Sequence, residues 1–107
     1  MTKSIRIYLA AALVSSLVGA VAFAQNSAEA TYKAKCQMCH GAKGMADTPA
    51  AKSMKVLPAT DPAVKSMSEA AMVEEVTNGK GKMPAYKGKL SDAEIKDLVA
   101  YYRTFSK

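Results

Sequence analysis

The sequence predicts a small all-α domain, and three observations lead to this fold class. Beyond residue 24, no stretch alternates apolar and polar residues in the way that a half-buried strand would. Apolar residues instead recur three and four positions apart, the spacing of one helix face, and capping residues stand where these stretches begin. The segments between them contain most of the glycine and proline, which favour loops.

The N-terminus is expected to be a cleaved secretory signal peptide, residues 1–24, followed by one domain over residues 25–107. Lys3 and Arg6 precede a long uncharged stretch, and Ala22-Phe23-Ala24 fits the small-x-small cleavage pattern. The alternative is a retained membrane anchor, because about 17–25 apolar residues can span a bilayer.

The first half of the domain contains one clear helix signal. Ser27 can cap a helix over residues 28–39, in which Ala28, Tyr32 and Cys36 are four positions apart. Residues 41–60, with two glycines and two prolines, are expected to form a loop with at most one helical turn.

Helix starts are clearer in the second half. Asp61-Pro62 places a capping residue before a proline at the first helical position. Ser68 can cap a helix over residues 69–77, which Asn78-Gly79 would end. A loop rich in lysine and glycine follows.

The last helix is expected over residues 92–104. Ser91 and Glu94 form a capping box at its start. Its apolar residues share one face, at Ile95, Leu98, Val99 and Tyr102.

A domain of this size and composition can bury only a modest core. It has 83 residues and no tryptophan, and such domains usually need a disulfide, a metal or another staple. Of the 15 basic residues two lie in the signal peptide, which leaves 13 against 9 acidic residues and a net charge of +4. This charge favours acidic partner surfaces but is too small and dispersed to predict nucleic-acid binding.

The motif CQMCHG contains both cysteines and the only histidine of the chain, Cys36, Cys39 and His40. A zinc site would need a fourth ligand, a redox-active cysteine pair normally sits near a βαβ pattern, and a plain structural disulfide leaves the histidine unexplained. C-x-x-C-H is the pattern of covalent haem attachment. On a helical turn all three side chains share one face, so the two thiols and the imidazole can meet one flat ligand. A backbone carbonyl near Pro49 is expected to hold the second nitrogen of His40.

Three motifs in this order, CQMCHG, NGKGKMP and LSDAEIKDLVAYYR, resemble the small class I c-type cytochromes of bacteria. The resemblance covers essentially all of residues 25–107 and implies three to four short helices wrapped around one covalently bound haem c. It departs from the family at Ala28, where a glycine usually allows the first and last helices to cross closely. Tyr32 and Tyr101 match the family's two aromatic residues, which pack against each other.

The resemblance implies His40 and Met83 as the axial ligands of the iron. Met83 lies in a glycine-rich loop between two helices, far from His40 in sequence, and Pro84 stiffens the chain after it. The other methionines of the domain are less suited, because they lie too close to His40 or in stretches where methionine is an ordinary core residue: Met38, Met45, Met54, Met67 and Met72.

These features lead to the hypothesis of a periplasmic electron carrier that is not an enzyme, because iron with both axial positions filled has no site for substrate. The alternative is a haem c subunit of a larger periplasmic oxidoreductase complex. A gas sensor or a dihaem peroxidase does not fit, since a distal methionine is present and a second C-x-x-C-H is absent. The mature protein is expected to be a monomer that does not span the membrane. It is expected to meet the acidic surfaces of redox partners through a group of lysines, unless these form only a solvated loop: Lys80, Lys82, Lys87 and Lys89.

Overall fold

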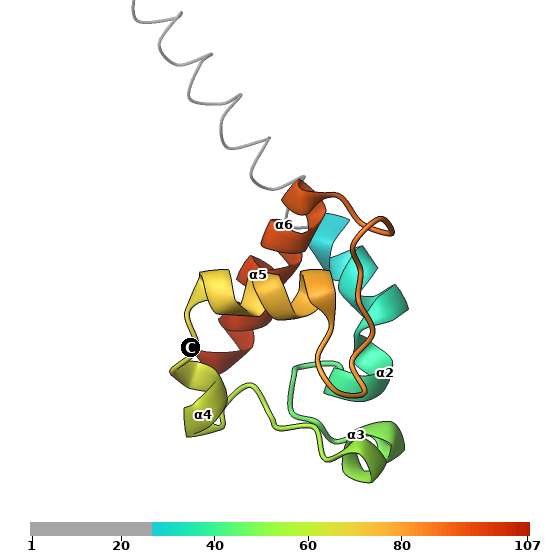
Figure 1. Cartoon of the computed structure of the whole chain (residues 1–107). Helices are drawn as coiled ribbons and strands as arrows, with labels where there is room; N and C mark the ends of the chain where they lie inside the picture. The colour runs from blue at the N-terminus through green and yellow to red at the C-terminus, as the bar shows by residue number, and fades with distance from the viewer. Residues whose placement is uncertain (1–26) are drawn as a thin grey trace, which may run out of the picture.

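The computed structural model describes residues 27–107, and these residues are mostly helical (Figure 1). The predicted signal peptide lies outside the described residues. A helix over residues 27–35 is followed by five α-helices and a final 3₁₀ turn: α2 (Gln37–His40), α3 (Pro49–Met54), α4 (Pro62–Lys65), α5 (Glu69–Asn78), α6 (Asp92–Arg103) and η1 (Thr104–Ser106). Between residues 27 and 107 there is no strand, only two isolated bridges in the loop before α6. The predicted all-α class is confirmed.

The two long helices start where the capping signals placed them. The side chain of Ser68 accepts a hydrogen bond from the backbone N–H of Ala71 at the start of α5. The full capping box of Ser91 and Glu94 is present at the start of α6. Gly79 ends α5 with φ at +77°, a conformation that glycine adopts without steric cost.

The expected first helix is interrupted at Cys36. The backbone N–H groups of Cys39 and His40 both donate to the carbonyl oxygen of Cys36, so the turn tightens and α2 starts anew. The loop over residues 41–60 contains a whole short helix, α3, where at most one turn was expected. Thr48 caps it and Pro49 occupies its first position, the same arrangement that was recognised at Asp61 and Pro62.

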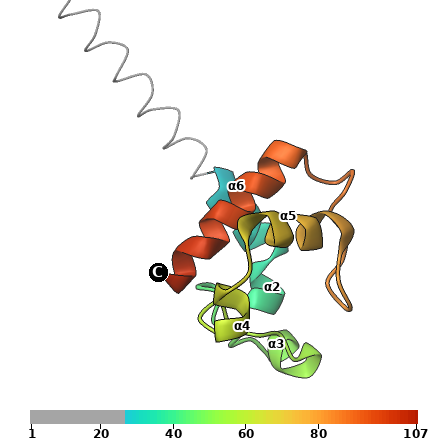
Figure 2. The same cartoon turned by 60° about the vertical axis from the view of Figure 1, so that its left-hand side comes forward.

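The long loop between α5 and α6 descends past α2 and then returns to the start of α6 (Figure 1). Helix α5 packs across α6, and α2 packs against α3. In both views α3 and α4 lie at the end of the molecule opposite the start of α6 (Figure 2). Within residues 27–107, no helix has the length and apolar character needed to cross a membrane.

The core is small and lies between the first helix and α6. Tyr32, Leu90, Ile95 and Leu98 form its buried cluster. The rings of Tyr32 and Tyr101 meet edge to face with centroids 5.5 Å apart, which confirms the expected aromatic pair. Ala28 is only 5% exposed, so the position that usually carries glycine is filled by a buried methyl group. Tyr32 and Leu98 of this cluster also line a cavity.

Candidate functional site

A cavity of about 1000 Å³ lies between the helices and is lined mainly by apolar side chains. One wall carries Cys36, Cys39 and His40, and the long loop contributes Met83 on another part of the lining. The four predicted site residues therefore surround a single space. Its volume is at the upper end of the range usual for sites that enclose a small molecule or cofactor.

The turn at Cys36 brings the two thiols to the cavity. Both cysteines are half-buried, line the cavity and are free thiols. Burial raises the pKa of the Cys36 thiol to about 11, since little water is present to solvate the thiolate. Near neutral pH the Cys36 thiol therefore keeps its proton.

His40 presents a neutral imidazole with an unused nitrogen. Its Nδ1 atom is buried and has no hydrogen-bond partner among the described residues. Burial lowers the pKa of the ring, so the imidazole keeps a free lone pair at neutral pH. Tyr102 supports the ring edge-on, with centroids 5.5 Å apart. The expected carbonyl near Pro49 does not hold Nδ1, because Pro49 heads α3 and carbonyls there bond along the helix.

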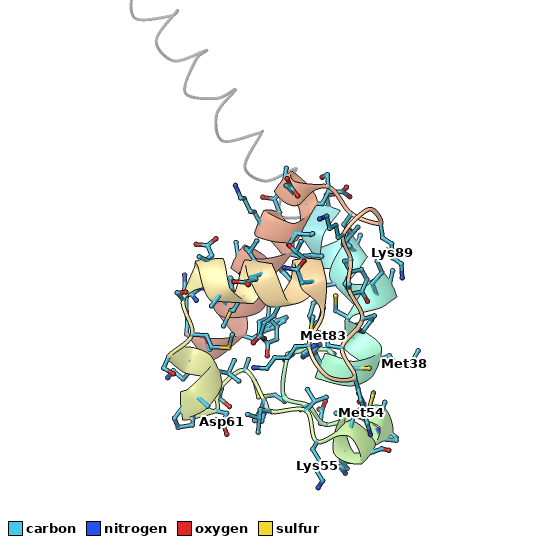
Figure 3. All side chains as sticks on the ribbon, in the orientation of Figure 1. Met38, Met54, Lys55, Asp61, Met83 and Lys89 are labelled. Carbon is cyan, nitrogen blue, oxygen red and sulfur yellow. The ribbon has the colours of Figure 1, made fainter. Side chains whose placement is uncertain are left out.

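A tight turn presents Met83. Lys80 and Met83 exchange two backbone hydrogen bonds of 3.1 and 2.9 Å, and Gly81 between them has φ at +57°. Two-residue hairpin turns need such a positive φ, which explains the glycine. Figure 3 labels Met83 on the loop that passes α2 and Met38 on α2 itself.

Four further methionines line the same cavity: Met38, Met54, Met67 and Met72. Met72 is buried, and its Sδ lies 3.9 Å from Nη1 of Arg103. This cationic neighbour makes Met72 a poor metal ligand. Met38 is the most exposed of these side chains, at 76%. Sequence spacing alone could not show that Met54 and Met67 share the cavity, because the chain folds back through α3 and α4.

The predicted lysines separate into two groups. Lys80 and Lys82 line the cavity, whereas Lys87 and Lys89 do not. All four are exposed, and Lys80 forms an ion pair of 3.1 Å with Glu75. Two more lysines line the cavity, Lys35 and Lys55, which come from other parts of the chain and were not predicted from the sequence.

Comparisons with known proteins show which family the chain belongs to. Residues 23–101 match the family described as cytochrome C oxidase, cbb3-type, subunit III. Cytochrome c6 of Leptolyngbya boryana is 40% identical over 70 residues, which cover 65% of this chain and 79% of that protein. Cytochrome c6 of a Picosynechococcus species is 35% identical over 109 aligned positions, 94% of this chain and 92% of that protein.

A solved structure shares the fold as well. The "KustC0563 c-type cytochrome" superposes with a TM-score of 0.68 at 27% identity, over 74% of this chain and 96% of that chain. The chain therefore belongs to the small class I c-type cytochromes, electron-transfer proteins that carry one covalently bound haem c.

Proposed function

We propose that Cys36 and Cys39 attach the haem as thioethers and that His40 and Met83 bind its iron from opposite sides. The observation that carries this assignment is the single cavity lined by all four side chains. The donor set fits the group: two free thiols on one turn, and an imidazole whose buried Nδ1 has no protein partner. Imidazole and thioether are the ligand pair of electron-transfer haems.

The residues of the chain give the site its electron-transfer character. When bound, the haem supplies a one-electron couple between ferric and ferrous iron. His40 and Met83 would be the two residues that hold the iron, and they would leave no position open for a substrate. The apolar lining, including Val56, Leu57 and Val99, excludes water from the site. Little solvent then has to reorganise when the charge at the site changes.

The proposed role is that of a free electron carrier outside the cytoplasm, in the periplasm of a bacterium. The positively charged and then apolar start of the sequence supports export. The cytochrome c6 relatives favour the free carrier, because alignment with one of them covers 92% of that protein. The alternative, a haem c subunit of an oxidoreductase complex, is favoured by the description of the matching family as an oxidase subunit.

The proposed contact with partners is electrostatic. Lys35, Lys55, Lys80 and Lys82 stand around the same cavity, and Glu75 is the one acidic residue in the lining of that cavity. Positive charge around the site would steer it toward the acidic surface of a redox partner. Lys87 and Lys89 do not line the cavity but extend the positive charge along the loop. Figure 3 shows Lys89 far from Lys55.

A redox titration of the purified exported protein, followed by absorption spectroscopy, tests the assignment. A single one-electron transition is expected, with a methionine–iron charge-transfer band in the far red in the oxidised form. An oxidised protein without this band would contradict Met83 ligation. Purification then separates the two roles: a free carrier elutes as a monomer, whereas a subunit copurifies with its complex.

A further inference from the structure

The loop that carries Met83 is held mainly by the helix before it. Three backbone N–H groups of the loop donate to the last turn of α5 at 2.8–3.0 Å: Gly79 to Glu75, Tyr86 to Val76 and Lys87 to Thr77. The ion pair between Lys80 and Glu75 joins the same two segments. All these contacts fix the loop to α5, and none fixes it to the segment that carries Cys36.

One side chain makes that second connection. The hydroxyl of Tyr86 donates a hydrogen bond of 3.1 Å to the backbone carbonyl oxygen of Lys35, a residue 51 positions earlier. In the described chain, no other hydrogen bond or ion pair joins residues 79–90 to residues 27–48. The bond therefore closes the loop against the first helix.

The acceptor is a carbonyl that the break in the helix leaves without its usual partner. The residue that would bond it in a continuous helix is Cys39, but the N–H of Cys39 donates to Cys36 instead. A carbonyl at a helix end needs a replacement partner, and the Tyr86 hydroxyl supplies one. This carbonyl belongs to the peptide group between Lys35 and Cys36. The hydrogen bond from Tyr86 is therefore made directly before the first cysteine of the C-x-x-C-H motif.

The surroundings of Tyr86 suit a donor that stays in place. Tyr86 is half-buried, packs against the core and also lines the cavity. Burial raises the pKa of its hydroxyl, which therefore keeps the proton that it donates. Lys89 lies with Nζ 5.9 Å from the centroid of the ring, within the range of a cation–π contact.

We propose that Tyr86 is a positioning residue that latches the Met83 loop to the haem-attachment segment and so holds Met83 on the iron against competing ligands. The proposal rests on the ligand assignment above. Tyr86 follows Met83 by three residues, and Lys35 directly precedes Cys36. The latch thus ties the segment of the distal ligand to the attachment segment through the one hydrogen bond that joins residues 79–90 to residues 27–48 in the described chain.

Imidazole, which competes with methionine for haem iron, is a direct probe of the latch. The oxidised holoprotein is titrated with imidazole and the far-red band is followed in wild type, Tyr86→Phe and Tyr101→Phe. Tyr101→Phe is the matched control, because its hydroxyl makes no hydrogen bond to the described residues while its ring packs on Tyr32. Tyr86→Phe is expected to bind imidazole about two- to tenfold more tightly, the factor for one net hydrogen bond.

Urea unfolding of the same three proteins separates positioning from general loosening. Both variants can lower the unfolding midpoint, but only Tyr86→Phe is expected to change imidazole affinity in the absence of urea. Equal imidazole affinity in wild type and Tyr86→Phe would overturn the latch and leave the ligand assignment intact, and an equal gain in Tyr101→Phe would overturn it too. A wild-type protein without the far-red band would overturn the Met83 assignment and the latch together.

Discussion

Gly79 lies directly against the backbone of Met83. A Cβ atom on Gly79 would stand 2.8 Å from the Met83 carbonyl oxygen and 3.0 Å from the backbone nitrogen of Ala85. Its φ of +77° is in the left-handed region, which residues with a side chain rarely adopt. The end of α5 and the loop of the proposed ligand are thus packed backbone to backbone, and glycine is needed there for two separate reasons.

Gly79→Ala is therefore expected to displace the Met83 loop. Gly88→Ala is the control, because Gly88 has a similar φ of +81° but no atom within 4 Å of the added Cβ. The control should lower the free energy of unfolding by about 1–2 kcal/mol from backbone strain alone. Gly79→Ala should lower it further and weaken the far-red band. Urea unfolding and absorption spectra measure both effects; equal losses in the two variants would contradict the close packing.

Met83→Ala is expected to abolish the far-red band and to lower the reduction potential, because the thioether ligand is removed. Met72→Ala is the control: Met72 lines the same cavity and is buried, but its sulfur faces Arg103. It should keep the band while losing about 2–5 kcal/mol of stability. A band that persists in Met83→Ala would move the ligand to Met54 or Met67.

Covalent attachment is tested by denaturing the protein in acid and extracting it with organic solvent. The wild-type haem should stay with the polypeptide. Single Cys36→Ser and Cys39→Ser variants should each keep it through the remaining thioether, and the double variant should release it. Release from the wild type would refute the thioether assignment.

The parts of the fold that sequence could predict are those with local causes. The starts of α5 and α6 depend on Ser68 and Ser91, whose side chains bond to backbone groups three residues ahead. The pairing of Tyr32 with Tyr101 was implied by the family resemblance and is found in the structure. These relations need only a few neighbouring residues or a known motif.

The parts that sequence could not predict depend on tertiary packing. Nothing in the spacing of Lys35 and Lys55 shows that they share one cavity with Lys80 and Lys82. The break of the helix at Cys36 could not be predicted either, because it depends on the local backbone hydrogen bonds. The hydrogen bond from Tyr86 to the Lys35 carbonyl, which this break leaves free, joins residues 51 positions apart. The α3 start was missed for a different reason: Thr48-Pro49 is a local signal of the same type as Asp61-Pro62.

The capping box predicts a pH dependence of stability. The backbone N–H of Ser91 donates to Glu94 at 3.0 Å, and hydrogen bonds from Ser91 lower the pKa of the Glu94 carboxyl. A folded-state pKa below the unfolded one gives stability that is present above the unfolded pKa and is lost as pH falls through the folded pKa. Between about pH 5 and 3, where glutamate titrates, wild type should lose more stability than Glu94→Gln, which keeps a hydrogen-bond acceptor that does not titrate. Parallel urea midpoints over this range would contradict the prediction.

Four lysines line the cavity and are here called its rim: Lys35, Lys55, Lys80 and Lys82. They are expected to affect the rate of electron transfer rather than the reduction potential. Lys82 is exposed and lines the cavity, whereas Lys96 on α6 is also exposed but does not line it and serves as the control. Lys82→Glu should slow second-order transfer to an acidic redox partner at low salt by reversing charge where the partner must approach. Added salt should shrink the difference from wild type, because the Debye length falls to about 10 Å at 0.1 M ionic strength. Lys96→Glu alters the net charge by the same amount. If the position of the charge at the rim matters, the rate of electron transfer should fall clearly more in Lys82→Glu than in Lys96→Glu. Equal rates for the two variants in stopped-flow measurements would assign the effect to net charge alone and would refute docking at the rim.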